Sequence, residues 1–510
     1  MPPVPMPLPP LNRRLLAGLP RRAGFPAVGP LDAFPERVVQ FGEGNFLRSH
    51  VDWMLNRMNA QGLFRGRAVV VQPIARGRVD VLNAQDGLYT VLLRGLQGGE
   101  VVEQREIITA ISRGLDPYRG WEAFLALAAQ PDLRFAVSNT TEAGIAYVEE
   151  PPPAGRTPAS FPAKVTAFLA ERFRRLGGTP DSALIFLPCE LIDRNGECLR
   201  ACILQHAAAW GLGAAFARWV TQDHRFCNTL VDRIVPGYPR EEAARLQEEL
   251  GYEDRLLTAG EIFHTWVIEG DARAELPLLE GGIDAVWTTD LQPYRTLKVR
   301  ILNGAHTMLA LPAFLAGLDT VREAVEHEVL GGLLRRAVFE EILPVLAFPE
   351  AEKRAYAEGV LERLHNPFIR HALLSIALNS VAKFRVRVLP SLLEHRARFG
   401  APPRALAFSL AALLAFYRGT EVRDGALQGR RDGQPYAAQD DLPVLAAFAE
   451  AWGAHGAHGD ATRVARAMLG RRDFWGEDLT ALPDLARLVA SDLTRILTTG
   501  VRAAAAALGG

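Results

Sequence analysis

The sequence is short of cysteine, of net charge and of long apolar runs, and each shortage argues against a class of protein. Its 510 residues contain four cysteines, Cys189, Cys198, Cys202 and Cys227, none of them in a CxxC pair. So few cysteines argue against a disulfide framework and fit a reducing compartment, so we expect a cytoplasmic protein. Cys198 and Cys202 have helix-face spacing among apolar neighbours, which favours packing over metal binding.

The charges nearly cancel, because 57 Lys and Arg residues stand against 58 Asp and Glu residues. A net charge of -1 gives no global attraction to nucleic acid or to an anionic membrane, although a local basic pocket for a small anion remains open. No stretch approaches the roughly 20 apolar residues of a membrane span. We therefore expect a small-molecule partner. No heptad or strand-edge pattern predicts an assembly, so a monomer or a weak oligomer is expected.

The length of the chain exceeds what one hydrophobic core usually serves, so two domains are expected. The first thirty residues are rich in proline and arginine and lack an apolar segment of signal-peptide length. Residues 1–30 are therefore predicted to form a disordered tail. The ordered part is predicted to begin at the β-prone run 37–41.

The first half of the chain alternates short apolar runs with helical patterns, which is typical of a parallel sheet covered by helices. A helix is predicted from residue 46 to about 59, and a hairpin from segments 88–93 and 101–108. Buried strands are predicted at residues 37–41, 68–71, 135–138 and 184–187.

Long helical patterns dominate the second half, and no convincing strand is found in it. The predicted helices are residues 297–315, 320–346, 350–364, 368–384, 404–417 and 442–452. The predicted fold class is therefore α/β. A Rossmann-like domain with a mostly parallel sheet is expected over residues 31–290, followed by a mainly α-helical domain over residues 291–505.

A glycine-rich turn, Gly42-Glu43-Gly44, lies between the first predicted strand and the following helix, as a pyrophosphate site requires. Leu47 stands where GxGxxG has its third glycine. The second strand ends in Gln72-Pro73 and not in an acid that would bind a ribose hydroxyl. The motif predicts dinucleotide binding, with a plain tight turn as the alternative.

Polar clusters follow the later strands, and ligands of open α/β sheets bind beyond the carboxyl ends of strands. One cluster is 139–142 and the other is Cys189-Glu190. A strand-end cap is an equal alternative for Glu142. The predicted cofactor-binding residues are Phe41, Gly42, Glu43, Gly44, Asn45, Phe46, Asn139, Thr140 and Glu142.

The segment from Lys298 to His306 carries the strongest local chemistry. On an α-helix, Asn303 and His306 lie about 140° and about 80° around the axis from Lys298, so the three side chains can face one cavity. A lysine in a dry pocket can act as an acid or base, and an asparagine amide can donate to a developing alkoxide. The alternative is a surface helix with a solvated lysine.

Together these motifs resemble the long-chain polyol dehydrogenases, the mannitol dehydrogenase family. The Lys-x4-Asn-Gly-x-His pattern of residues 298–306 is similar to the catalytic signature of that family, and the resemblance covers about residues 35–500. The matching segments, which look most like the branch that reduces ketouronates, are 40–48, 85–90, 138–145, 188–193, 229–234 and 301–307.

The resemblance implies an NAD-dependent, metal-independent enzyme that reversibly reduces D-tagaturonate to D-altronate in hexuronate breakdown. Fructuronate or fructose is the alternative substrate, and a cofactor-binding sensor without turnover is a further alternative. By the same resemblance, Lys298 gives a proton to the carbonyl oxygen, Asn303 hydrogen-bonds that oxygen, and His306 orients the substrate through a hydroxyl. Hydride comes from the nicotinamide.

Two departures from the family pattern concern the substrate. Polyol-oxidising relatives carry a Cys-Asp-Asn run where this sequence has Cys189-Glu190-Leu191, but Asn195 is retained and is predicted to bind substrate. In a later segment of four polar positions only Lys383 is kept. Lys383 with Arg385 or Arg387 is predicted to hold the substrate carboxylate, with an exposed basic stripe as the alternative.

Overall fold

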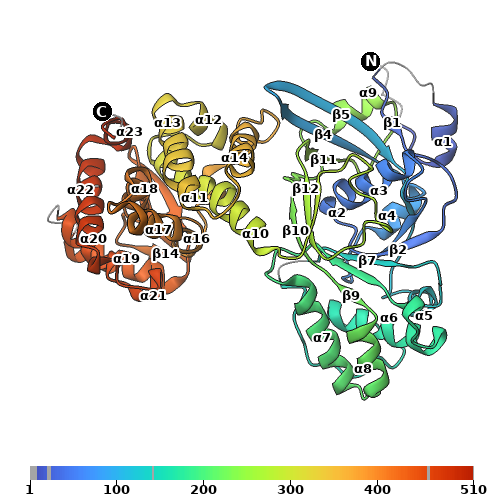
Figure 1. The fold of residues 1–510 in the computed structure, drawn as a ribbon. Coiled ribbons are helices and arrows are strands. Elements are labelled where there is room, and N and C mark those ends of the chain that lie inside the picture. The colour runs from blue at the N-terminus through green and yellow to red at the C-terminus, as the bar shows by residue number, and fades with distance from the viewer. Residues whose placement is uncertain (1–7, 20–23, 141–142, 456–459, 509–510) are drawn as a thin grey trace. The chain divides into compact units, whose positions relative to one another are not determined.

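The structure is a computed structural model that describes residues 8–19, 24–140, 143–455 and 460–508. The chain divides into two compact units, Met1–Leu291 and Gln292–Gly510 (Figure 1). Each unit has a buried hydrophobic core of its own. Among the described residues, none of the helices combines the length and the apolar character needed to cross a bilayer.

A six-stranded parallel sheet forms the centre of the first unit. Its strands run in the order β6-β3-β2-β7-β8-β9. They are β2 (Glu36–Phe41), β3 (Arg67–Val71), β6 (Ile111–Leu115), β7 (Phe135–Ser138), β8 (Ile185–Pro188) and β9 (Arg225–Phe226). This is the 3-2-1-4-5-6 order of a doubly wound fold, whose strand order reverses between β2 and β7. The four buried strands predicted from the sequence are confirmed.

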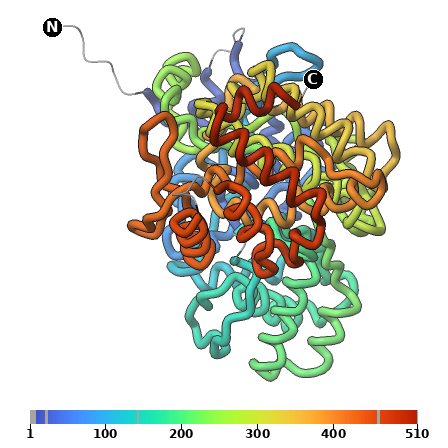
Figure 2. The backbone as a smooth tube through the Cα atoms, turned by 90° about the vertical axis from the view of Figure 1, so that its left-hand side faces the viewer, coloured from blue at the N-terminus to red at the C-terminus, as the bar shows by residue number. Residues whose placement is uncertain are grey.

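Helices cover both faces of this sheet, because alternate side chains of a strand point to opposite sides. Val38 and Val70 pack with α2 and α3, whereas Val39 and Val69 pack with α5 to α8. Helices α7 and α8 lie side by side in both views (Figures 1 and 2). The helices are α2 (Asn45–Ser49), α3 (Val51–Ala60), α4 (Val79–Ala84), α5 (Trp121–Leu127), α6 (Phe161–Leu176), α7 (Asn195–Ala209), α8 (Gly213–Gln222) and α9 (Ala243–Leu250).

The predicted hairpin is present as β4 (Tyr89–Gln97) and β5 (Glu100–Ile108). The strands β1 (Ala27–Val28) and β11 (Thr258–Glu261) extend it to a sheet of order β1-β5-β4-β11. A third sheet consists of β10 (Asn228–Asp232), β12 (Thr265–Glu269) and β13 (Ala285–Thr288).

The N-terminal segment is packed where it is described, which differs from the predicted tail of residues 1–30. Helix α1 (Arg13–Gly18) is capped by the side chain of Asn12, which accepts a hydrogen bond from the Leu15 amide at 2.8 Å. Leu11 and Leu16 are buried in a small cluster against the hairpin sheet. A few leucines among many prolines and arginines are enough to anchor the segment.

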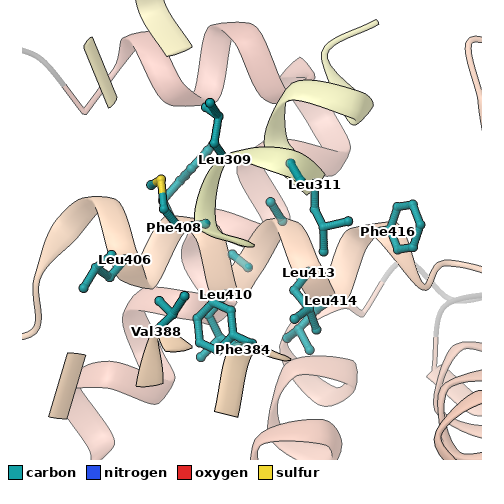
Figure 3. Close-up of a cluster of buried hydrophobic side chains, with 14 of the residues drawn as sticks. Leu309, Leu311, Phe384, Val388, Leu406, Phe408, Leu410, Leu413, Leu414 and Phe416 are labelled. Carbon is teal, nitrogen blue, oxygen red and sulfur yellow. The ribbon is translucent and has the colours of Figure 1, made fainter. Parts of the chain in front are cut away.

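The second unit is a bundle of helices around α18 (Arg404–Phe416), which is buried from Ala405 to Phe416. Figure 3 shows leucine and phenylalanine side chains of α18 beside Leu309 and Leu311 of α11 and Phe384 of α16. The other helices are α10 (Gln292–Lys298), α11 (Gly304–Leu315), α12 (Val321–Glu326), α13 (Glu328–Arg336), α14 (Glu350–Leu364), α15 (Leu373–Ile376), α16 (Ser380–Arg387), α17 (Leu389–Phe399), α19 (Leu442–His455), α20 (Ala461–Leu469), α21 (Arg472–Trp475), α22 (Pro483–Thr499) and α23 (Val501–Ala506).

The predicted fold class is confirmed, but several expectations about the second half are corrected. The helices predicted at residues 320–346 and 368–384 are both interrupted, the first at His327 between α12 and α13 and the second between α15 and α16. The long helix predicted at residues 297–315 is α10 and α11 joined by a π-helical turn, Val299–Asn303. The expectation of no strand is wrong, because a three-stranded antiparallel sheet is present. Its strands are β14 (Val422–Arg423), β15 (Ala426–Arg431) and β16 (Gln434–Ala438).

Candidate active site

The glycine turn of the first unit stands where the strand order of the sheet reverses. Phe41, the last residue of β2, pairs with Ser138, the last residue of β7. Gly42 has φ +128°, and a Cβ there would lie 3.1 Å from the Asn139 carbonyl oxygen, so only glycine fits. A Cβ on the exposed Gly44 would meet nothing within 4 Å. The backbone at Gly44 thus borders open space, as a pyrophosphate-binding turn requires.

The predicted loop residues divide between core and surface. The Phe41 ring is buried against Phe124 and Phe161 at centroid distances of 6.2 and 5.3 Å, so its side chain supports the loop from below. Asn45 accepts a 2.6 Å hydrogen bond from the buried Arg48 guanidinium. The half-buried Phe46 ring packs on the His50 ring at 4.9 Å.

Arg48 links the glycine turn by hydrogen bonds to the segment that precedes β11. Its guanidinium also donates to the Glu43 carbonyl at 3.1 Å and to the Leu256 carbonyl. By binding the Glu43 carbonyl and the Asn45 side chain, the guanidinium fixes the backbone conformation of the glycine turn.

The Glu43 side chain reaches from this turn to the loop that follows β3. Its Oε1 accepts a 3.1 Å hydrogen bond from the Arg78 amide. Oε2 is buried and has no hydrogen-bond partner among the described residues. Burial raises the pKa of the Glu43 carboxyl, and the Arg78 amide lowers it by a smaller amount.

A buried carboxylate at the end of β8 organises the second polar cluster. Glu190 accepts hydrogen bonds from the Ser138 hydroxyl at 3.0 Å and from the amide and hydroxyl of Thr140 at 3.0 and 3.1 Å. Asn139 donates to the Cys189 carbonyl at 2.8 Å. Burial raises the pKa of the Glu190 carboxyl. Asn139 thus stands beside Gly42 and Thr140 is bound to Glu190, whereas Glu142 lies outside the described residues.

Asn195 has a structural role, which corrects the prediction that it binds substrate. Its amide nitrogen donates to the carbonyls of Pro188, Glu190 and Thr229 at 2.9–3.0 Å. Its oxygen accepts from the amides of Gly196 and Thr229 at 2.9 and 2.8 Å. The side chain is only 1% exposed. These bonds use both ends of the amide, which links the loop after β8 to β10 and leaves no group for a ligand.

In the second unit, Lys298 ends α10 and Asn303 ends the π-helical turn that follows. An i→i+5 hydrogen-bonded turn brings residues five apart above one another. Lys298 and Asn303 therefore stand closer to a common face than the 140° of a regular α-helix would place them. Both are half-buried. Single π-turns of this kind are frequent at functional sites.

Gly304, directly after the π-turn, allows α16 to approach closely. A Cβ there would lie 3.2 Å from the Arg387 carbonyl oxygen and 3.6 Å from that of Val299. The glycine of the Asn-Gly-x-His pattern is thus required by packing between α11 and α16.

His306 lies one turn further along α11, against a second histidine. The ring centroids of His306 and His371 are 5.0 Å apart, with an interplanar angle of 58°. Burial, and then the nearby charge of Lys383, lower the pKa of His371, which keeps its imidazole neutral at neutral pH. In the sequence, His371 stands at the first of the four polar positions of the segment that ends at Lys383, but its contact with His306 follows only from tertiary structure.

Lys383 and Arg387 form a pair of cations on α16. They are four residues apart, so they share one helix face, and both are half-buried. The Lys383 ammonium donates to the Ile376 carbonyl at 3.0 Å, and an Arg387 Nη1 lies 3.4 Å from the Thr307 hydroxyl oxygen on α11. Burial, and then the charge of Arg387, lower the pKa of Lys383, and the charge of Asp440 opposes them by a smaller amount.

Arg385 stands apart from this pair. It is exposed, and its guanidinium contacts the Asp473 carbonyl at 3.4 Å, beside Gly476. Of the two arginines proposed as partners of Lys383, the structure therefore places Arg387 beside the lysine and turns Arg385 elsewhere. Among the described residues, no three His, Cys, Asp or Glu side chains are grouped so as to hold a metal ion.

Comparison with protein families identifies both units. The mannitol dehydrogenase Rossmann domain matches residues 36–281, and the mannitol dehydrogenase C-terminal domain matches residues 290–497. The chain belongs to the mannitol dehydrogenase family. The resemblance drawn from the sequence motifs is thereby confirmed, and with it the assignment to a family of oxidoreductases.

Relatives named altronate oxidoreductase are similar over almost the whole chain. The protein of Halalkalibacterium halodurans is 44% identical over 92% of this chain and 92% of its own length. Those of Yersinia enterocolitica and Cronobacter sakazakii are 44% and 45% identical over 94% and 93% of this chain, which is 98% and 97% of their lengths.

Two solved structures share the fold at lower identity. A D-sorbitol dehydrogenase in substrate-free form has a TM-score of 0.79 at 23% identity, covering 97% of this chain and 99% of its own. Pseudomonas fluorescens mannitol 2-dehydrogenase, in a ternary complex with NAD and D-mannitol, has a TM-score of 0.68 at 21% identity, covering 98% and 99%.

Proposed function

We propose that this enzyme uses NADH to reduce D-tagaturonate to D-altronate, and catalyses the reverse oxidation with NAD. The single observation that carries the choice of a sugar acid is the half-buried pair Lys383 and Arg387. Like charges four residues apart on a helix repel each other, and an anion between them relieves that repulsion. A carboxylate fits this place better than the neutral end of a polyol, because arginine binds carboxylates bidentately.

The relatives support the same choice, since those named altronate oxidoreductase are at least 44% identical over more than nine-tenths of this chain. Turnover, and not cofactor sensing alone, is supported by the intact set of Lys298, Asn303 and His306.

Residues of the second unit bind the reacting oxygen of the substrate and exchange a proton with it. Lys298 gives a proton to the carbonyl oxygen during reduction and takes it back during oxidation. The Asn303 amide donates a hydrogen bond to the same oxygen as negative charge develops on it. His306, whose ring packs against the His371 ring, orients the substrate through a hydroxyl group. When bound, NADH supplies the hydride that the carbonyl carbon receives, and is oxidised to NAD.

The cofactor is proposed to bind at the glycine turn of the first unit. Gly42 and Gly44 let the backbone approach the pyrophosphate, and Asn139 and Thr140 border the same turn at the carboxyl end of β7. The mannitol 2-dehydrogenase that shares this fold was solved in a complex with NAD, which supports NAD as the cofactor here.

A spectrophotometric assay of NADH oxidation tests the substrate. The purified enzyme is given tagaturonate, fructuronate and fructose in turn, and the highest kcat/KM is expected with tagaturonate. A higher kcat/KM with fructuronate would show that the enzyme catalyses the mannonate-forming reaction instead. A higher value with fructose would overturn the sugar-acid assignment.

Variants of α16 test the carboxylate contact. Lys383→Ala and Arg387→Ala are each expected to raise KM for tagaturonate about tenfold or more, and to change KM for fructose much less. Arg385→Ala is the matched control and should change neither value. Equal effects on the acid and on the neutral ketose would refute the assigned role of the pair.

A further inference from the structure

The second strand of the central sheet, β3, lacks the acid that commonly selects NAD. In doubly wound folds, an acid after this strand accepts a hydrogen bond from the adenosine ribose 2′-hydroxyl. Here β3 is followed by Gln72 and Pro73, and the first acid along the chain is Asp80 on α4. The Asp80 carboxylate is exposed and paired with Arg119 at 2.6 Å. Asp80 therefore does not replace the missing acid.

Glu43 brings a carboxylate to this position from another part of the chain. It belongs to the glycine turn after β2, but its Oε1 is bound by the Arg78 amide in the loop after β3. A Cβ on Gly77 would lie 2.3 Å from Glu43 Oε1 and 2.3 Å from the side-chain oxygen of Gln72. The glycine at 77 thus leaves room for the carboxylate at the end of β3.

The arrangement leaves one acceptor of Glu43 unused. Oε2 is buried and accepts no hydrogen bond from any described residue. A buried carboxylate oxygen without a donor costs free energy that a ligand hydroxyl can recover. A phosphate group at the same point would instead meet a like charge.

We propose that Glu43 selects NAD over NADP, with Oε2 accepting the adenosine ribose 2′-hydroxyl and repelling a 2′-phosphate. The inference rests on the proposed function, because it requires a dinucleotide at the glycine turn. Two arginines of the loop after β3, Arg76 and Arg78, differ in whether their guanidinium groups already have a partner. The Arg78 guanidinium donates to the Arg255 carbonyl at 2.8 Å, whereas Arg76, which directly precedes Gly77 in the same loop, is exposed.

Titration of the enzyme without substrate tests the selection. NADH and NADPH are added separately to wild type, Glu43→Gln and the matched charge-neutralising control Asp80→Asn, and binding is followed by nicotinamide fluorescence. The glutamine keeps an acceptor for the Arg78 amide, so the loop is expected to keep its fold, and near-ultraviolet circular dichroism checks this. Arg76→Ala in the Glu43→Gln background tests the source of any gained NADPH affinity.

Wild type is expected to bind NADH about tenfold or more tightly than NADPH. Glu43→Gln should narrow that ratio about tenfold, mainly by tightening NADPH binding, and Asp80→Asn should leave the ratio unchanged. A folded Glu43→Gln with the wild-type ratio would overturn the inference but leave the proposed reaction standing. A wild type that binds neither dinucleotide would overturn the proposed function and the inference with it.

Discussion

Neutralising Asp52, which shares the Gln40 side chain as a hydrogen-bond partner with the glycine turn, should change how stability depends on pH. Asp52 is fully buried, and its Oδ2 accepts hydrogen bonds from Gln40 at 3.1 Å and from the Tyr89 hydroxyl at 3.3 Å. The same Gln40 nitrogen donates to the Gly42 carbonyl at 3.1 Å, which connects Asp52 to the turn. Burial raises the pKa of Asp52 from 3.8 to about 7, against smaller opposing effects of these hydrogen bonds and of Arg48.

The size of the effect follows from linkage between protonation and folding. Between pH 3.8 and about 7 the folded state holds a proton that the unfolded state has lost, so the free energy of unfolding falls as pH rises through this window. The full penalty above the folded pKa is about 4 kcal/mol, at 1.36 kcal/mol for each unit of pKa. An asparagine side chain at this position would mimic the protonated form of the aspartate. When the pH is raised from 4.5 to 8, the free energy of unfolding of Asp52→Asn should therefore increase by about 3 kcal/mol relative to that of wild type.

Urea unfolding of wild type and Asp52→Asn at these two pH values measures the difference, with tryptophan fluorescence as the signal. Asp80→Asn, which removes an exposed carboxylate, is the control and should show a small pH-independent change. A stability difference between Asp52→Asn and wild type that is the same at pH 4.5 and pH 8, or that favours wild type at pH 8, would refute the raised pKa of Asp52.

Two further substitutions separate binding from structural support. Gly42→Ala places a side chain at φ +128° and 3.1 Å from the Asn139 carbonyl, which costs about 1–3 kcal/mol, so NADH affinity measured by fluorescence titration should fall about tenfold. Gly98→Ala, at another positive φ with no atom within 4 Å of its Cβ, should leave that affinity unchanged. Asn195→Ala should lower the free energy of unfolding by about 2–4 kcal/mol and leave KM for tagaturonate unchanged. A large rise in KM without loss of stability would instead show that Asn195 binds substrate.

The parallel sheet was predictable because its strands carry short continuous apolar runs that alternate with helical patterns along the first half of the chain. Residues 135–138 and 68–71 are apolar or nearly so, and both are buried strands. The small sheet of the second unit was missed although its signal was present. Asp432-Gly433 joins β15 to β16 with φ values of 51° and 78°, which is the conformation that an Asp-Gly hairpin turn adopts. Helical periodicity on either side concealed this turn.

The helix breaks were not predictable in the same way. Residues 299–303 are ordinary helix formers, and nothing in their composition distinguishes a π-turn from an α-helix. The break at His50 likewise depends on packing around α2 and α3, which local propensity does not report.

For the candidate site, the residue types predicted the chemistry of the side chains better than they predicted where those side chains point. Asn195 is predicted from the sequence to bind substrate, but the sequence does not show that its amide points into the protein. The choice between Arg385 and Arg387 was not available from the sequence, because the predicted helix ends at residue 384. In the structure α16 continues to Arg387, and only residue 387 shares a helix face with Lys383 at i,i+4 spacing. The reach of Glu43 to the loop after β3 depends on tertiary structure alone.

The central claim is that the Lys298 amine exchanges a proton with the substrate oxygen, and the most direct measurement is kcat for tagaturonate reduction by Lys298→Ala. We predict a loss of about 10²- to 10⁴-fold in kcat with unchanged NADH affinity, while Thr296→Ala on the exposed side of α10 stays at the wild-type rate. A folded Lys298→Ala enzyme that turns over within a few-fold of wild type would contradict the account.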